Sequence, residues 1–121
     1  MPKVPFNNQP CQSLSAADLS ALGFGRNKAT AARAPTTLPV DNFCTYLGNS
    51  GQAQVGYVTQ GDYQMNQDAN RSTSRVAPSD LPGVFYDGQG GLWFTKDGYY
   101  VVIAGGNAYK ERVAHIIVGK L

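Results

Sequence analysis

Few side chains in this sequence could carry out acid–base or nucleophilic chemistry. The 121 residues include one histidine, His115, and one glutamate, Glu111. Histidine is the usual acid–base residue near neutral pH, but His115 lies in an apolar C-terminal stretch that predicts a helix flank. The carboxylates Asp62 and Asp68 could form an acid–base pair, but they fall in a polar stretch typical of solvated loop acids. The inventory for catalysis is therefore sparse.

Recognisable catalytic and cofactor motifs are also missing. No phosphate loop, dinucleotide fingerprint, zinc motif or nucleophile elbow occurs in the sequence. The glycine-rich stretch 87–91 lacks the Lys-Ser or Lys-Thr ending of a phosphate loop, and a hairpin turn explains it better. We therefore expect no enzyme activity, no catalytic residue, no cofactor and no metal ligand.

The two cysteines, Cys11 and Cys44, allow four interpretations: free thiols, a redox pair, half of a metal site, or one structural disulfide. Their spacing is far from Cys-x-x-Cys, which argues against a redox pair. A zinc site needs about four ligands, and one histidine cannot complete it. A structural disulfide is the best interpretation, and it favours an oxidising compartment such as the cell envelope or the exterior.

Length and composition predict one small folded domain. Hydrophobic residues make up 42% of the chain, enough for a core, and 14 glycines and seven prolines predict many turns. The net charge of +2 gives no indication of a nucleic-acid partner. The longest apolar run, 99–104, is too short to span a membrane.

The polar, proline-rich start predicts a flexible tether over residues 1–10, followed by a single α+β domain over 11–121. No apolar signal segment is visible at the start. Either the protein is cytosolic or a signal has been removed. We favour the second interpretation, in which the tether follows a removed signal or lipid anchor.

A short helix is predicted over residues 15–22. Ser15 suits the N-cap, and Asp18 can return the hydrogen bond of a capping box. Leu14 and Leu19 occupy the two positions of a hydrophobic staple around that cap. A glycine follows where a helix would end in a left-handed residue.

Two β-hairpins are predicted. The segments 43–47 and 53–59 flank a turn cluster, and Asp97-Gly98 between two apolar runs indicates a type I′ turn. That turn divides the strand residues between two faces: Leu92, Phe94, Val101 and Ile103 on one, and Trp93, Thr95, Tyr100 and Val102 on the other.

The remaining segments complete the predicted fold. Residues 25–41 predict an irregular basic loop, and residues 61–74 fit a short helix or a loop equally well. The C-terminal helix has Asn107 as its expected cap, an apolar side with Tyr109, Val113, Ile116 and Ile117, and flanks with Lys110, Glu111, Arg112 and His115. We expect an α+β fold in which an antiparallel sheet of about five strands carries a short N-terminal helix and a C-terminal helix.

The N-terminal motif resembles a known family. Pro10-Cys11-x-x-Leu14-Ser15-x-x-Asp18-Leu19-x-x-Leu22-Gly23 is similar to the opening of secreted actinobacterial lipoproteins of unknown function. In that family a second cysteine lies two residues before an aromatic, as in Cys44-Thr45-Tyr46, with Tyr where Trp is common. The family's strand, turn, strand and closing helix also resemble residues 84–121. The departures are a missing signal, a missing lipid-anchor cysteine and a short middle region.

The resemblance implies export by a lipoprotein signal and a disulfide between Cys11 and Cys44, and it implies no reaction. Tyrosine and tryptophan combine apolar area with a polar tip, which suits recognition. We expect a ligand or partner surface at Trp93 and Tyr100, with Tyr57 and Tyr99 as further candidates. The alternative is that these aromatics form core or cross-strand pairs.

The expected function is that of a non-catalytic accessory or binding domain of a secreted lipoprotein. It would recognise a protein partner or an apolar envelope molecule, bind no nucleic acid, and reach the membrane only through a lipid anchor absent from this chain. Two alternatives are an inhibitor or immunity-type module that blocks a secreted enzyme, and a small envelope hydrolase.

Overall fold

The computed structural model describes residues 2–32, 41–49, 51–71, 76–105 and 109–121. Its centre is an antiparallel sheet of six strands in the order β1-β2-β3-β6-β5-β4. The strands are β1 (Asn27–Ala32), β2 (Phe43–Gly48), β3 (Gly51–Val58), β4 (Phe85–Tyr86), β5 (Leu92–Lys96) and β6 (Tyr99–Gly105). The helical elements are α1 (Pro5–Asn8), η1 (Pro10–Gln12), α2 (Ala16–Ala21), α3 (Gln60–Ala69) and α4 (Lys110–Lys120).

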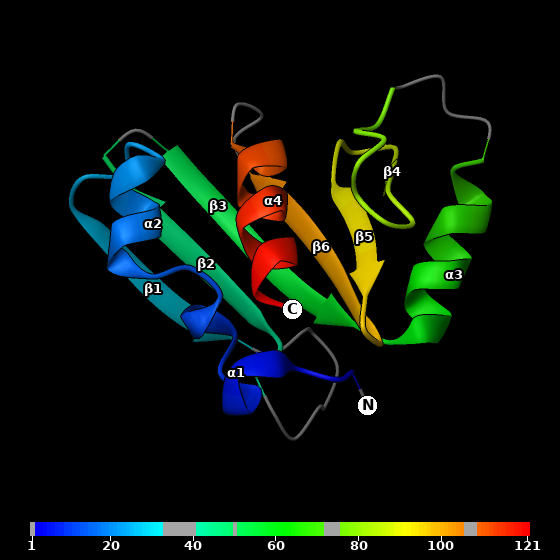
Figure 1. The fold of residues 1–121 in the computed structure, drawn as a ribbon, viewed down its shortest axis with the longest axis horizontal. Coiled ribbons are helices and arrows are strands. Elements are labelled where there is room, and N and C mark those ends of the chain that lie inside the picture. Colours follow the sequence, from blue (N-terminus) through cyan, green and yellow to red (C-terminus); the bar gives the residue numbers. More distant parts are fainter. Residues whose placement is uncertain (1, 33–40, 50, 72–75, 106–108) are drawn as a thin grey trace.

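The arrangement confirms the predicted α+β class. In Figure 1, α2 and α4 lie on one face of the sheet, with α4 against β5 and β6, and α3 lies at the β4 end of the sheet. The sheet has six strands where the sequence predicts about five. The main core lies on the face covered by α2 and α4, where Leu19 and Ile117 of these helices pack with Val55 and Ile103 of the sheet.

Helix α2 forms where the sequence predicts it. The side chain of Ser15 accepts a hydrogen bond from the Asp18 N–H at 3.1 Å, and Asp18 accepts one from the Ser15 N–H at 2.8 Å. Leu14 and Leu19 are both buried, as expected of a hydrophobic staple. Gly23 follows with a φ of +85°, the left-handed conformation that ends the helix.

The hairpin of β5 and β6 is also confirmed. Asp97 and Gly98 have φ values of +54° and +82°, as a type I′ turn requires. The register pairs Lys96 with Tyr99 across the turn and continues without a break along both strands. Strand alternation then places the predicted residue sets on opposite faces of the sheet.

The disulfide between Cys11 and Cys44 is present, with a Cα–Cα distance of 5.0 Å. Cys11 lies in η1, and Cys44 is fully buried in β2, which pairs with β3 as the predicted hairpin. The bond therefore attaches the N-terminal segment to β2, the strand next to the β1 edge of the sheet, shortly before helix α2 begins.

Strand β1 corrects the prediction of an irregular loop over residues 25–41. Asn27–Ala32 pairs with β2 along its whole length, and residues 33–40 lie outside the described residues. The segment alternates polar and apolar residues only over 28–31, and its apolar members are alanines, so the strand signal there is weak. Pairing with β2 determines its conformation, because strand formation depends on context more than on propensity. Helix α3 forms in the polar segment for which helix and loop were equally expected.

The N-terminal segment is packed on the domain over its described part, whereas the sequence predicts a flexible tether. Val4 belongs to the core, and Pro2, Pro5 and Pro10 are buried. Proline side chains lose almost no rotamer entropy on burial, so a proline-rich segment can be ordered at low entropic cost. Sequence composition alone does not distinguish such a segment from a tether.

Helix α4 packs Val113, Ala114 and Ile117 against the sheet, which confirms the predicted closing helix. Lys110 corrects one detail, because it is 4% exposed rather than a solvated flank residue. Its ammonium donates a hydrogen bond to the carbonyl of Gly90, and this bond compensates for the burial of the charge. The expected cap, Asn107, lies outside the described residues.

Candidate functional site

The four aromatic residues selected from the sequence lie on both faces of the sheet. The register and strand alternation place Trp93 and Tyr100 on the face away from α4, and Tyr57 and Tyr99 on the face that α4 covers. Tyr57 is fully buried, Trp93 is 7% exposed, and the other two are half-buried. The structure therefore brings Trp93 and Tyr100 together and separates them from Tyr57 and Tyr99.

Trp93 belongs to a small aromatic cluster with residues of α3 and β4. Its ring stacks on Phe85, with centroids 5.6 Å apart and planes 13° from parallel. Tyr63 of α3 packs against Phe85 at 5.4 Å and against Tyr100 at 5.1 Å. The rings therefore cover one another, as in the alternative interpretation of core and cross-strand pairs, and little of the indole faces solvent.

Asp87 is the polar residue that holds this cluster in place, and the sequence analysis did not select it. One carboxylate oxygen accepts hydrogen bonds from the N–H groups of Gln89 and Gly91, both at 2.8 Å. The other accepts a hydrogen bond from the Trp93 indole at 2.8 Å. The carboxylate thus closes the 87–91 turn and satisfies the nearly buried indole N–H. Its bond two residues along the chain is an Asx-turn, a signal that could have identified it from sequence.

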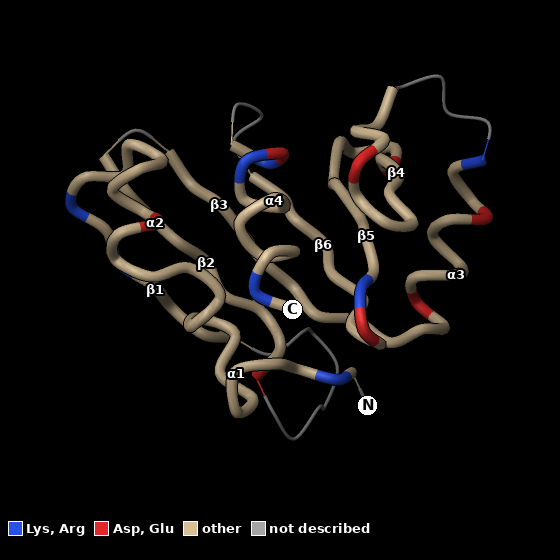
Figure 2. Tube along the Cα trace, viewed as in Figure 1, with Lys and Arg blue, Asp and Glu red and all other residues tan. Residues whose placement is uncertain are grey.

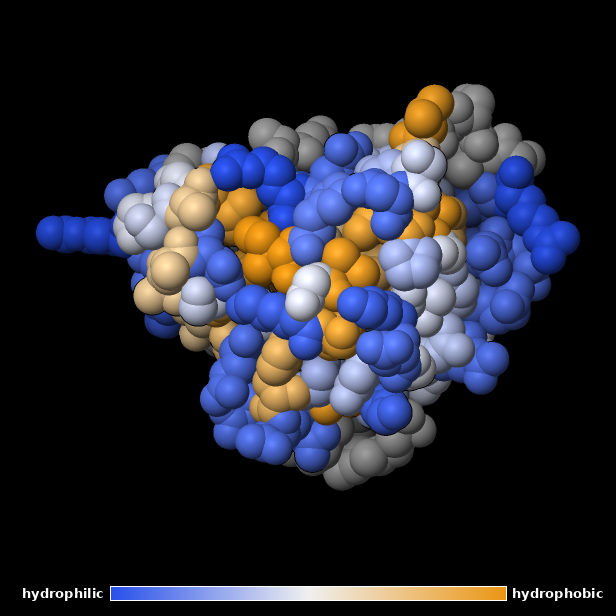
Figure 3. All heavy atoms as spheres, viewed as in Figure 1, coloured by the Kyte–Doolittle hydropathy of each residue, from blue (hydrophilic) through white to orange (hydrophobic). Residues whose placement is uncertain are grey.

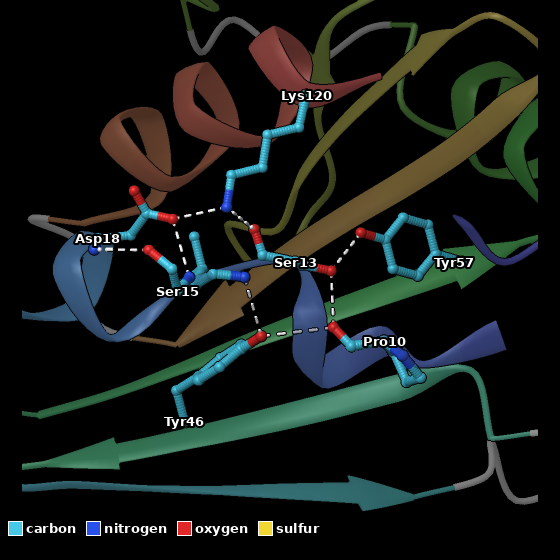
Figure 4. Close-up of polar contacts among 8 residues, drawn as sticks. Pro10, Ser13, Ser15, Asp18, Tyr46, Tyr57 and Lys120 are labelled. Atoms are coloured by element: carbon cyan, nitrogen blue, oxygen red, sulfur yellow. Dashed lines mark hydrogen bonds and ion pairs between the residues drawn. The ribbon is translucent and has the colours of Figure 1, made fainter. Parts of the chain in front are cut away.

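A second polar cluster joins the N-terminal segment to Tyr46 of β2 and Tyr57 of β3 (Figure 4). The buried Ser13 hydroxyl donates a hydrogen bond to the Pro10 carbonyl at 2.6 Å and forms another with the Tyr57 hydroxyl. Tyr46 accepts a hydrogen bond from the Leu14 N–H at 3.2 Å. The cluster satisfies the polar groups of the N-terminal segment where it crosses the sheet.

The hydroxyl groups of this cluster stabilise the fold. Burial raises the pKa of Tyr46 to about 12, and burial raises the pKa of Tyr57 above its ordinary value as well. Both phenols are therefore neutral near pH 7 and serve as hydrogen-bond partners. Lys120 of α4 completes the arrangement with bonds to the Ser13 carbonyl at 2.9 Å and to Asp18 at 2.6 Å (Figure 4). These bonds connect the C-terminal helix to helix α2.

His115 lies beside an acid on the molecular surface. Its Nε2 is 2.5 Å from a carboxylate oxygen of Asp80, and its Nδ1 is 2.6 Å from the Glu111 carbonyl. The hydrogen bond with Asp80 raises the pKa of His115, and the same bond lowers the pKa of Asp80. Both acceptors require an N–H, so the arrangement fits the imidazolium form, in which neither nitrogen can act as a base. The pair joins the segment before β4 to helix α4.

Strand β1 is the most exposed regular element of the structure. Among the described residues it pairs with β2 alone, and all six of its residues are exposed. Figure 2 shows lysine or arginine where β1 begins, and Arg26 and Lys28 are the residues there. The ion pairs found within the described ranges involve neither of them. This edge is our candidate functional site.

The helix-covered face offers a different surface. Hydrophobic side chains gather over α4 and beside it, with hydrophilic residues around them (Figure 3). Ile116, Val118 and Leu121 are half-buried members of this group. No pocket occurs among the described residues, so this face presents a shallow apolar patch.

No protein-family model, curated protein or solved structure matches this chain. None of the helices in the described part of the chain is long and apolar enough to cross a membrane. Within the same ranges, no three histidine, cysteine or acidic side chains gather as a metal site requires. The resemblance to secreted lipoproteins therefore stays a prediction that rests on the N-terminal motif.

Proposed function

We propose that this chain is a non-catalytic binding domain of a secreted cell-envelope lipoprotein and that it recognises a protein partner. The Cys11–Cys44 disulfide supports the compartment, because such bonds form and persist outside the reducing cytoplasm. The capped helix after Cys11 has the geometry that the lipoprotein-like motif implies. These features support the resemblance from which export and lipid anchoring are proposed.

The single observation that carries the binding role is the exposure of β1. A strand in a small domain ordinarily buries one face, but β1 buries neither face, and no strand of the described residues lies on its outer side. Exposed strand edges are templates for pairing with another chain. Small molecules generally bind in concave sites, so an open strand edge suits a protein partner better than an apolar envelope molecule.

The proposal of a non-catalytic role rests on the two groups with the most catalytic potential. His115 has both ring nitrogens engaged as donors. Ser13 is fully buried, and its hydroxyl is bound to Pro10 and Tyr57. Ser13 is therefore inaccessible to a substrate, and the exposed His115 already has a partner at each ring nitrogen, which favours a binding domain over the alternative of an envelope hydrolase.

Site-specific photo-crosslinking tests this proposal. The full-length protein with its natural leader is made in its own cells with a photoreactive residue at one of three exposed positions: Thr30, Leu47 or Met65. We expect light-dependent adducts with one envelope protein from at least one position, identified by mass spectrometry. A partner that is a secreted enzyme, and that loses activity when the purified domain is added, would specify the role as an inhibitor.

Two results would contradict the proposal. One is the absence of an adduct from all three positions when the protein is correctly exported. The other is hydrolysis of generic ester or peptide substrates by the purified domain that is abolished in the His115→Ala variant. The matched control is His115→Gln, which retains a polar side chain but cannot act as an acid or base near pH 7.

A further inference from the structure

We infer that the outer edge of β1 binds an extended, acidic segment of a partner protein, which adds to the sheet as a further strand. This inference rests on the proposed binding function and names both the surface and the chemistry of the partner. It follows from a comparison of the two sheet edges, from the side chains of β1 and from their charge.

The two edges of the sheet differ in how far they are open. At one edge, β4 is two residues long, and the preceding segment is held by hydrogen bonds from Thr95 to Pro82 and from Tyr63 to Gly83. The Asp87 turn follows directly. Short strands flanked by turns are a common protection against edge-to-edge pairing. This edge is therefore closed to an incoming strand.

The β1 edge lacks these protections. The strand has six residues in unbroken register with β2, from Asn27 opposite Gly48 to Ala32 opposite Phe43. It contains no proline or glycine, and its last four residues are Ala29, Thr30, Ala31 and Ala32. Such small side chains leave the backbone accessible from the side. Half of the backbone N–H and C=O groups of an edge strand point outward, where a peptide backbone can pair with them.

Charge identifies the kind of segment that fits. Arg26 and Lys28 stand at the start of β1, and none of the ion pairs found in the described ranges includes them. Asp18, the acidic residue of neighbouring α2, is bound to Lys120 instead. Carboxylates on the incoming strand opposite residues 26–28 would complement these charges, and small or β-branched residues would suit the alanine-rich remainder.

A second copy of this chain fits the edge less well. Pairing of two six-residue strands would form a strip only about 20 Å long and 5 Å wide. Stable dimers generally bury more than about 1,000 Å² in total, which a contact limited to this strip would not reach. The basic residues at the edge would also gain no opposite charge from β1 of the copy. A different, acidic chain supplies what the copy lacks.

Peptide titration tests the inference on the complete, disulfide-bonded chain. The probe is an eight-residue peptide of alternating valine and glutamate, acetylated at its N-terminus and amidated at its C-terminus. Its binding is measured at low salt from the NMR shifts of the protein's backbone amides. We expect shift changes confined to β1 and its flanks. A peptide with lysine in place of glutamate should bind at least about tenfold more weakly, because its charges repel Arg26 and Lys28. The glutamate peptide with every backbone amide N-methylated should lose binding, because neither of its edges then offers an N–H group to β1.

Charge-reversal variants supply the matched control. Lys28→Glu should lower the affinity for the glutamate peptide about fivefold or more and raise the affinity for the lysine peptide. Arg71→Glu makes the same charge change at the end of α3, in an exposed ion pair with Asp68, and should alter the affinity less than about twofold. Both positions are exposed, so neither variant disturbs the core.

Four results would overturn the inference. They are shift changes centred on the apolar patch over α4 or on Trp93, equal affinity for the lysine peptide, unchanged binding of the N-methylated peptide, and self-association through β1. Crosslinks from Met65 without peptide binding at β1 would contradict strand addition and leave the binding function intact. Peptide binding at β1 without any adduct in cells would support the edge chemistry and contradict the proposed function.

Discussion

Removal of the Cys11–Cys44 disulfide should destabilise the domain by about 3.7 kcal/mol. The cysteines are 33 residues apart, and a loop of that size loses about 12.5 cal/mol/K of denatured-state entropy in the chain-entropy treatment. For 121 residues, the unfolding entropy near the midpoint is about 250 cal/mol/K, so Tm should fall by about 15 °C. Alanine is the suitable replacement, because Cys44 is fully buried and serine would place an extra hydroxyl in the core.

The assay is urea and thermal unfolding of the oxidised protein and of the Cys11→Ala/Cys44→Ala double variant, monitored by circular dichroism. Each single alanine variant serves as a control, because either one alone breaks the bond. Intact-mass measurement should show a gain of two hydrogen atoms when the disulfide of the unmodified protein is reduced to two thiols. A double variant within about 1 kcal/mol of the oxidised protein would refute the reasoning, because the bond would then not restrict the unfolded chain.

Four further predictions concern individual side-chain contacts. Because the raised pKa of His115 depends on Asp80, Asp80→Asn should move the NMR titration midpoint of this one histidine down towards about 6.5; an unchanged midpoint would contradict the pairing. In the intact pair, the stabilisation from His115 is present below its unfolded pKa and is lost as pH rises through its raised folded pKa. The stabilisation from Asp80 is present above its unfolded pKa and is lost as pH falls through its lowered folded pKa. The contribution of the pair to the free energy of unfolding should therefore be largest in mildly acidic solution. Asp87→Ala should cost about 2 kcal/mol in urea unfolding and change the fluorescence of the single tryptophan, because the Trp93 and Gly91 N–H groups lose their acceptor; unchanged emission would argue against that bond. Gly56→Ala should cost about 1–3 kcal/mol because its Cβ would overlap the Phe43 ring, and Phe43→Ala in the same chain should remove most of that penalty; strict additivity of the two changes would exclude the contact.

Local sequence rules account for the elements that the sequence predicts well. The capping box of Ser15 and Asp18 and the type I′ turn at Asp97-Gly98 each depend on a few adjacent residues, so their geometry can be predicted from sequence. Strand β1 depends on a partner instead, because its short, alanine-rich sequence carries only a weak strand signal and β2 supplies its hydrogen bonds. The packing of Val4 similarly requires the rest of the core.

The candidate site likewise combines features that the local sequence predicts with features that depend on tertiary packing. Trp93 and Tyr100 do share a face, as the hairpin register predicts, but whether Tyr63 would cover that face depends on the position of α3. Tyr57 was selected by residue type, yet its face is the one that α4 and the N-terminal segment bury. The exposed β1 edge could not be predicted, because exposure of a strand depends on which elements pack elsewhere. Residue type identifies side chains suited to binding, and tertiary packing decides which of them solvent can reach.

Amide hydrogen exchange along β1 in the purified chain is the decisive measurement, because a binding site at this edge needs a formed strand with an unpaired outer side. Amides bonded to β2 should exchange slowly, and the intervening ones should exchange rapidly, in alternation from Asn27 to Ala32. Uniform protection would mean that the outer edge is already covered, and uniformly rapid exchange would mean that no stable strand exists there. Either result would contradict a binding site at the β1 edge.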